Sequence, residues 1–285
     1  MGIPTLYMTD LDGTLLDATG RLSETTIRIL KPLIAEGLPL VCCTARSLVH
    51  TKPIVHTLGC QYPVVCYSGG MIYDPVIKEM IHTHQTPEHQ VRAILSLADR
   101  HGLSPFIYTM ADDGCEHVYY CETNSDGASK YLEDRERRGD YRFVHDPSFT
   151  QWTGEDCYFL SFMGEKDQLL PLIPFIESLD LSINLTQSYY YTNTWWLEIT
   201  QKDQSKGHAL GHLKERYNAK HVMAFGDTSG DIAMLQAADC GIAVANASDA
   251  LKAIADQIIG SNDEDSVAHH IALHAARIAS LSERN

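Results

Sequence analysis

The chain has 285 residues, of which 44% are apolar and 21% charged, and this is enough material for about two globular domains with packed cores. Its 22 basic and 37 acidic side chains give a formal net charge of −15, which argues against nucleic-acid binding because no basic patch offsets the acidity. No run reaches transmembrane length and no secretory signal opens the chain, so we expect a cytoplasmic protein without a membrane partner.

The eight cysteines agree with that compartment. Cys42 and Cys43 are adjacent in a strand-like run, and Cys66 and Cys240 also lie in apolar runs. The sequence holds no Cys-x-x-Cys pair. We therefore predict buried, reduced thiols rather than a disulfide framework.

The first third of the chain alternates predicted strands and helices. Residues 3–9 form an apolar run typical of a buried strand. Ser23 can cap a helix that ends at Gly37. Further elements are expected as a strand at 40–44, a helix at 47–58, a strand at 64–67 and a hairpin at 71–81. This alternation predicts a parallel sheet with helices on both faces.

The middle of the chain has a different pattern. Thr86, Pro87 and Glu88 mark the start of a helix, and Gly102 ends it. Strands rich in aromatic and β-branched residues are expected at 106–109, 117–120 and 158–163, followed by a helix at 167–179 and a strand at 181–185. We predict a separate α+β domain over residues 83–191.

From residue 195 the first pattern returns. Strands are expected at 197–200, 222–226 and 241–244, and helices at 205–217, 232–238, 248–255 and 266–281. The predicted fold class is therefore α/β: a doubly wound, Rossmann-like parallel-sheet core made of residues 1–82 and 192–285, interrupted by the inserted α+β domain.

The segment Asp10-Leu11-Asp12-Gly13-Thr14 follows the first predicted strand. Ligands of open α/β sheets bind at the carboxyl ends of strands. Two carboxylates two positions apart at such a place suit a divalent metal, an acid/base pair or a nucleophile. An ordinary Asp-Gly turn explains Asp12 and Gly13 but not Asp10, so this segment alone leaves both interpretations open.

Thr44, Ala45 and Arg46 follow the next predicted core strand. A hydroxyl, a backbone amide and a guanidinium together can bind phosphate. The alternative is a helix-capping Thr and a surface Arg, which is the more ordinary interpretation of this segment by itself.

Two more polar groups occur later in the chain. Lys206 stands in the first turn of a predicted helix, where a cation opposes the helix dipole unless an anion lies nearby. Asp227 and Asp231 lie between a strand and a helix, and two acids on such a loop suit a hard cation. A solvated Lys206 and a helix-capping Asp231 are the alternatives.

All four groups fall at carboxyl ends of strands in one predicted sheet, so the fold should bring them to one crevice. A phosphate beside a carboxylate is repelled by about 4 kcal/mol per charge pair at ~4 Å and an effective dielectric of ~20. Mg²⁺ between Asp10, Asp227 and a phosphate oxygen would cancel this repulsion, with Lys206 and Arg46 on the other oxygens. Asp10 would then attack phosphorus, and Asp12 would protonate the leaving alcohol and later activate water.

These segments resemble a known family. Asp10-Leu11-Asp12-Gly13-Thr14, Thr44-Ala45-Arg46, Lys206 and Gly226-Asp227…Asp231 are similar, in order, to the four motifs of the haloacid dehalogenase superfamily of phosphohydrolases. The insert resembles the α+β cap of the Cof-type subfamily, as do Ala245-Asn246-Ala247 and Asn262-Asp263-Glu264-Asp265. The resemblance spans essentially the whole chain.

The resemblance implies a Mg²⁺-dependent phosphatase that acts on small phosphomonoesters, often sugar phosphates and sometimes phosphorylated cofactors, through an aspartyl-phosphate. It implies these roles: Asp10 as nucleophile and metal ligand, Asp12 as acid/base and as metal ligand through its backbone carbonyl, Asp227 as metal ligand, Asp231 as an orienting group, and Thr44, Ala45, Arg46 and Lys206 as phosphate-binding residues. Two positions depart from the family pattern, since Gly230 and Ser68 stand where Asn is usual.

Other functions remain open at this stage. A phosphomutase would use the same Asp pair, but it needs several cations converging from the cap. A receiver-like signalling domain needs neither so large an insert nor the second Asp, and Gly230 leaves room for a catalytically impaired phosphate-binding protein. The pairs His208/His212 and His270/His274 have helical i,i+4 spacing, but no third zinc ligand is evident and we interpret them as helix-surface residues.

Overall fold

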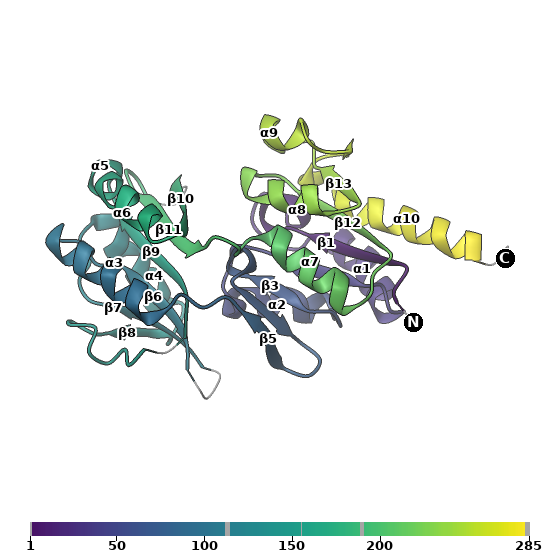
Figure 1. The fold of residues 1–285 in the computed structure, drawn as a ribbon. Helices are drawn as coiled ribbons and strands as arrows, with labels where there is room; N and C mark the ends of the chain where they lie inside the picture. Colours follow the sequence, from purple (N-terminus) through teal and green to yellow (C-terminus); the bar gives the residue numbers. More distant parts are fainter. Residues whose placement is uncertain (1, 112–114, 155, 189–190, 283–285) are drawn as a thin grey trace. The chain divides into compact units, whose positions relative to one another are not determined.

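The computed structural model describes residues 2–111, 115–154, 156–188 and 191–282. The chain divides into two compact units (Figure 1). Unit 1 comprises Met1–Thr83 and Gln204–Asn285, and unit 2 comprises His84–Asp203. Unit 2 is thus inserted between two segments of unit 1.

Unit 1 contains an eight-stranded sheet in the order β14-β13-β12-β1-β2-β3-β4-β5. The strands are β1 (Thr5–Thr9), β2 (Leu40–Cys43), β3 (Val64–Cys66), β4 (Met71–Asp74), β5 (Glu79–Thr83), β12 (His221–Gly226), β13 (Cys240–Ala243) and β14 (Gln257–Ile258). The six strands from β14 to β3 pair in parallel, and β4 and β5 add an antiparallel hairpin at the edge. β1 is apolar and fully buried because a central parallel strand is covered on both faces.

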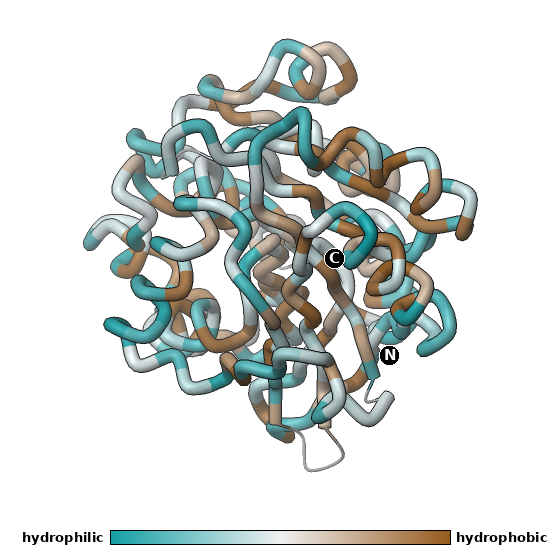
Figure 2. Tube along the Cα trace, turned by 90° about the vertical axis from the view of Figure 1, so that its left-hand side faces the viewer, coloured by the Kyte–Doolittle hydropathy of each residue, from teal (hydrophilic) through white to brown (hydrophobic). Residues whose placement is uncertain are grey.

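The helices of unit 1 connect these strands. They are α1 (Glu24–Ala35), α2 (Leu48–Leu58), α7 (Lys206–Arg216), α8 (Ile232–Ala237), α9 (Asp249–Lys252) and α10 (Ser266–Ser282). α1 packs beside α2 and α10, and α7 packs beside α8. Along the helices, hydrophobic and hydrophilic residues alternate (Figure 2), as expected for helices that bury one side. The predicted α/β, doubly wound fold class is confirmed.

The chain order places a topological switch point between β1 and β12. From β1 the sheet grows through β2 and β3 on one side, and through β12, β13 and β14 on the other. Right-handed crossovers in the two directions put their helices on opposite faces, which leaves a crevice at the carboxyl ends of the two central strands. The residues that follow β1 and β12 are Asp10 and Asp227.

Unit 2 contains a six-stranded sheet in the order β10-β11-β9-β6-β7-β8. Its elements are α3 (Glu88–Arg100), β6 (Phe106–Met110), β7 (Glu116–Tyr120), α4 (Asp126–Arg137), β8 (Phe143–His145), β9 (Asp156–Gly164), α5 (Lys166–Leu169), α6 (Ile173–Ser178), β10 (Leu181–Gln187) and β11 (Trp195–Gln201). Side chains from α3, α5, α6 and the central strands form one apolar core. Among the described residues of both units, no helix is long and apolar enough to cross a membrane.

The second boundary between the units differs from the sequence expectation. The sequence pattern predicts that residues 192–203 belong to the core, but their strand β11 pairs with β9 and β10 in the sheet of unit 2. Burial alternates along β11, with Leu197 and Ile199 buried between half-buried neighbours. That period-2 pattern belongs to an antiparallel sheet, whereas the parallel strands β1, β2 and β3 are buried throughout. The boundary therefore falls after Asp203.

Candidate active site

The loop after β1 carries the first acidic pair. The backbone N–H of Asp10 donates to the carbonyl of Phe225 (2.9 Å), which ties the end of β1 to β12. Gly13 adopts φ +77°, and a Cβ at this position would lie 2.4 Å from Asp227 Oδ2. Only glycine combines this left-handed backbone with so close an approach. The Asp-Gly turn is therefore real, and it also brings the loop against Asp227.

Lys206 lies between two buried carboxylates. Its Nζ donates to Asp10 Oδ1 at 2.5 Å and to Asp231 Oδ1 at 2.6 Å. The three residues are exposed by only 5%, 6% and 0% for Lys206, Asp10 and Asp231. The ammonium group of Lys206 lies in the first turn of α7, where the helix dipole disfavours a cation. Asp10 and Asp231 compensate that unfavourable interaction.

Asp231 and Thr14 organise the loop after β12. Asp231 Oδ2 accepts hydrogen bonds from the backbone N–H groups of Asp227 and Thr228, both at 3.0 Å. The hydroxyl of Thr14 donates to Asp227 Oδ1 (2.9 Å). One oxygen of Asp231 therefore contacts Lys206 while the other holds the loop that presents Asp227.

The electrostatics of this cluster are unbalanced. Burial raises the pKa of Asp10 to about 8, because the attraction of Lys206 does not offset lost hydration and repulsion from Asp231 and Asp227. Burial also raises the pKa of Asp227 to about 6, against the hydrogen bond from Thr14. Burial lowers the pKa of Lys206, but Asp10 and Asp231 outweigh it and hold this pKa well above its usual value.

The donor set fits a hard divalent cation. Carboxylate oxygens of Asp10, Asp227 and Asp231 lie within 4.8 Å of one another. Lys206 pairs with Asp10 and Asp231, and no described cation forms an ion pair with Asp227, so the buried cluster holds more acids than ammonium groups. Oxygen ligands and excess negative charge are what Mg²⁺ and similar cations require.

Asp12 points to a different partner. Arg46 Nε donates to Asp12 Oδ2 (2.7 Å) and Arg46 Nη2 donates to Asp12 Oδ1 (2.5 Å), which is a bidentate pair. The side chains of Arg46 and Asp12 are 27% and 51% exposed. Arg46, predicted to bind phosphate, therefore contacts the second acid of the motif in this structure, and its phosphate-binding role stays a prediction.

Thr44 and Ala45 complete the set of predicted residues. Thr44 is buried, and its Oγ1 accepts a hydrogen bond from the N–H of Arg46 (3.1 Å). Its backbone N–H donates to Val65 (2.9 Å), which fixes it at the end of β2. Ala45 is exposed. The structure thus brings together Asp10, Lys206, Asp227 and Asp231, and it places Asp12, Arg46 and Thr44 in a chain of contacts beside them.

Several residues that support the site received no role in the sequence analysis. Asn246 Nδ2 donates to the carbonyl of Gly13 (2.8 Å), and Asn246 Oδ1 accepts from the N–H of Asn262 (3.0 Å). Asn262 in turn donates to the carbonyl of Leu16 (2.9 Å). These two asparagines fasten the loop that carries both aspartates. They lie in the segments quoted for the family resemblance, which was the available signal.

Gly69 packs closely against the start of α7, the helix that carries Lys206. A Cβ at Gly69 would lie 2.5 Å from the carbonyl oxygen of Ser205, and the residue adopts φ +109°. Beside it, Gln204 donates to the carbonyl of Tyr67 (3.1 Å). Ser68, at the position where Asn is usual, also adopts a positive φ of 53°. Ser68 therefore belongs to the turn that supports α7.

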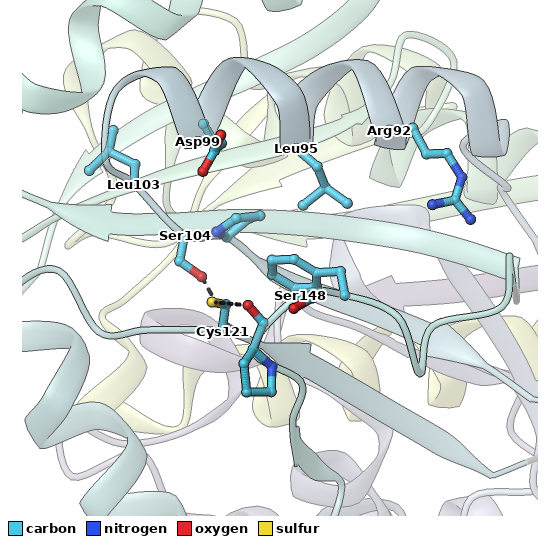
Figure 3. Close-up of a pocket in the computed structure, with 11 residues that line it drawn as sticks. Arg92, Leu95, Asp99, Leu103, Ser104, Cys121 and Ser148 are labelled. Carbon is cyan, nitrogen blue, oxygen red and sulfur yellow. Dashed lines mark hydrogen bonds between the residues drawn. The ribbon is translucent and has the colours of Figure 1, made fainter.

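A cavity in unit 2 has different chemistry. It encloses about 310 Å³ beside α3 (Figure 3). Figure 3 shows the thiol of Cys121, which donates to the carbonyl of Pro147 at 2.9 Å. Arg92 and Asp99 are its charged lining residues. Since the clustered carboxylates lie in unit 1, this cavity is not the candidate active site.

A family model for haloacid dehalogenase-like hydrolases matches residues 7–271. The chain belongs to this family. The predicted membership in the haloacid dehalogenase superfamily is thereby confirmed, as is the prediction that the protein is an enzyme of the hydrolase class.

Two relatives of this hydrolase are named as phosphatases of defined substrates. It is 28% identical to the pyridoxal phosphate phosphatase YbhA of Escherichia coli, over 93% of this chain and 96% of that protein. It is 23% identical to the 5-amino-6-(5-phospho-D-ribitylamino)uracil phosphatase YitU of Bacillus subtilis, over 94% and 96% of the two chains. These names support the predicted class of phosphoric monoester hydrolase.

The fold is also that of solved members of the family. A haloacid dehalogenase-like hydrolase from Bacteroides thetaiotaomicron superposes with a TM-score of 0.78. The two sequences are 24% identical, and the match covers 94% of this chain and 98% of the other.

Proposed function

We propose that this hydrolase is a Mg²⁺-dependent phosphatase that hydrolyses small phosphomonoesters through an aspartyl-phosphate on Asp10. The observation that carries the proposal is the buried cluster in which Lys206 contacts Asp10 and carboxylate oxygens of Asp10, Asp227 and Asp231 lie within 4.8 Å of one another. Charge of both signs is concentrated at the carboxyl ends of β1 and β12, where this fold binds ligands.

Asp10 and Asp227 would supply carboxylates for the cation and Asp12 its backbone carbonyl, while Asp231 would orient the loop that carries Asp227. Mg²⁺, when bound, neutralises the carboxylates and the phosphate oxygens so that two anions can approach.

The residues of the chain carry the chemical steps. A carboxylate oxygen of Asp10 attacks phosphorus, and the bond from phosphorus to the leaving oxygen breaks. Asp12 gives its proton to that oxygen, which departs as an alcohol. Asp12 then takes a proton from water, whose oxygen attacks the aspartyl-phosphate and releases inorganic phosphate. Lys206 stabilises the negative charge that develops on the equatorial oxygens.

The substrate class is a small phosphorylated metabolite. The named relatives act on a phosphorylated cofactor and on a phosphorylated ribitylaminouracil. We propose that this chain acts in the same range, which includes sugar phosphates and ring-bearing phosphorylated cofactors. The proposal also places the protein in the cytoplasm, where such substrates occur.

The test combines turnover with trapping of the intermediate. The wild-type protein should hydrolyse p-nitrophenyl phosphate with Mg²⁺, lose this activity in EDTA, and regain it when Mg²⁺ is returned. Rapid quenching with a ³²P-labelled substrate should trap acid-stable, hydroxylamine-sensitive label on the protein. Asp10→Asn should abolish both signals, whereas Asp203→Asn, an exposed acid of unit 2, should change neither. Full activity of Asp10→Asn would end the proposal.

A further inference from the structure

A second cavity lies in unit 1, at the edge of the sheet opposite to the candidate active site. It encloses about 330 Å³ between α10 and the starts of three parallel strands. His221, Cys240 and Gln257, which line it, are the first residues of β12, β13 and β14. Asp227 follows the last residue of β12, so this strand connects the two sites across about 17 Å of sheet.

The lining of this cavity is rich in cationic and titratable donors. α10 contributes His270, His274 and Arg277, and β12 contributes His221. Arg277 is exposed and forms no ion pair with any described residue. Gln257 adds an amide. Four basic groups converge here although the chain as a whole carries a net charge of −15.

The nearby carboxylates are already engaged. Asp239 accepts from Lys214 Nζ at 2.8 and 2.9 Å and from the N–H of Val222 at 2.8 Å. The same carboxylate lies 4.0 Å from His221 Nδ1. Asp256 accepts from the N–H of Gly241 at 2.7 Å. Asp239 thus pairs with the β12 side of the cavity, and no described carboxylate forms an ion pair with His270, His274 or Arg277 on α10.

The rings on α10 are held in place. His274 Nδ1 and the hydroxyl of Tyr7 are 2.8 Å apart, so the second nitrogen of His274 is the one left for a ligand. His270 packs edge-on against Phe225 with ring centroids 5.8 Å apart. Burial lowers the pKa of His274, and the charges of His221, His270 and Arg277 lower it further. An anion would relieve that repulsion.

We propose that this cavity binds a small organic anion of metabolite size, a carboxylate or a phosphate ester, as a site separate from the catalytic cluster. The volume lies in the range of small-molecule pockets and far exceeds the space that one metal ion needs. Met223, Cys240 and Leu273 line the cavity as well and offer the less polar part of a ligand a contact surface. Arg277 supplies the permanent charge, and His270 and His274 add charge when they bind protons.

Anion binding should take up protons. An anion beside His270 and His274 raises their pKa, so affinity increases as the pH falls from 8 to 6. The titratable and charged groups around these rings are His221 on β12, Arg277 on α10, Tyr7 on β1, and Asp239 and Asp256 beside β13 and β14. The hydrogen bond from Lys214 lowers the pKa of Asp239, so this carboxylate does not reverse the trend.

Histidine NMR of the full-length protein tests the proposal. Inorganic phosphate and succinate would be titrated separately in metal-free buffer, with the imidazole C–H resonances of His221, His270 and His274 as the readout. We expect these resonances to move with at least one probe and the affinity to fall at least 10-fold in Arg277→Gln. Resonances of His89 and His101, exposed histidines of unit 2, serve as internal controls. The matched variant Arg216→Gln, an exposed arginine at the end of α7, should bind like wild type.

The two probes distinguish a phosphate site from a carboxylate site. Three results would overturn the proposal: no movement with either probe, an equal affinity in Arg277→Gln, or a response to Zn²⁺ without a response to the anions. The last result would instead assign the histidines and Cys240 to a metal. Because Arg277 is exposed, its replacement does not endanger folding.

Discussion

Lys206 Nζ lies 2.5 Å from Asp10 Oδ1, although the two residues are 196 positions apart in the chain. Asp10 follows the first strand of the chain, β1, and Lys206 begins the helix that follows the inserted unit. Their contact exists only when both segments of unit 1 have assembled. The cluster that the proposed mechanism needs is therefore complete only in the folded unit.

Replacing Lys206 by Met tests the importance of this contact. The variant keeps a side chain of similar length but leaves Asp10 and Asp231 buried without their cation. We expect turnover to fall at least ~100-fold, because a donor to the transferred phosphoryl group is lost. Lys214→Met on the same helix removes a partly exposed ion pair and should retain activity.

Circular dichroism would show whether the Lys206→Met variant folds. Should it unfold without metal, the measurement is repeated in saturating Mg²⁺, which neutralises the same carboxylates. A folded Lys206→Met variant with near wild-type turnover would contradict the assigned role.

Gly13→Ala tests the close approach between the first loop and Asp227. The new Cβ would meet Asp227 Oδ2 at 2.4 Å in a backbone conformation with φ +77°. We expect a loss of stability of roughly 2–4 kcal/mol and a sharp loss of activity, since the loop must shift. Gly37→Ala is the matched control, because φ is +98° but no atom lies within 4 Å of the new Cβ.

Chemical denaturation measures both glycine variants. Gly37→Ala should cost about 1 kcal/mol, from backbone strain alone, and should leave turnover unchanged. Equal losses of stability in the two variants would show that the contact with Asp227 contributes nothing.

The sequence predicted the position of the clustered carboxylates better than the boundaries of the units. Asp10 and Asp227 follow short apolar runs, and the carboxyl ends of parallel strands share an edge of the sheet, so their proximity could be inferred. Strand β11 could not be assigned to a sheet from its apolar content. Only the alternation of buried Leu197 and Ile199 with half-buried neighbours distinguishes it from a core strand.

Other differences have local causes. The helix expected at 167–179 is divided into α5 and α6 with a short 3₁₀ turn at Leu170–Leu172, because Pro171 and Pro174 interrupt the hydrogen-bond ladder. The pairing of Arg46 with Asp12 was also not foreseen, since side-chain contacts between loops are not encoded in strand and helix patterns. Asn246 lies in a segment that resembles the family, but the sequence does not show what its side chain contacts. The structure shows that it donates to the carbonyl of Gly13.

The pKa of Asp10 makes the stability of the metal-free protein depend on pH. Its folded value of about 8 lies above the ordinary value of 3.8, so the folded protein keeps a proton that the unfolded chain releases. The stabilisation is complete below the ordinary pKa and is lost as pH rises through about 8. Asp10→Asn imitates the protonated acid at every pH.

We therefore expect metal-free Asp10→Asn to melt at a higher temperature than metal-free wild type, by ~3 °C or more at pH 8.5, with a smaller difference at pH 5. Differential scanning calorimetry at both pH values gives the difference in melting temperature between the variant and wild type. Other titrating groups are present in both proteins, so their contributions cancel in this difference. Mg²⁺ should raise the melting temperature of wild type more than that of the variant. A difference independent of pH would refute this account of Asp10.

Arg46→Lys separates two roles for the guanidinium. If Arg46 orients Asp12 through its two hydrogen bonds, a lysine cannot reproduce the bidentate geometry. We then expect kcat to fall by about 10-fold with KM little changed, because the proton donor is misplaced while substrate binding persists. If Arg46 instead binds phosphate directly, KM should rise most. Arg21→Lys, on the loop before α1, is the control and should change neither constant.

Steady-state kinetics with p-nitrophenyl phosphate and with an alkyl phosphate, which has a poorer leaving group, would show the distinction. A better leaving group needs less help from Asp12, so kcat should fall less with p-nitrophenyl phosphate than with the alkyl phosphate only if positioning is the defect.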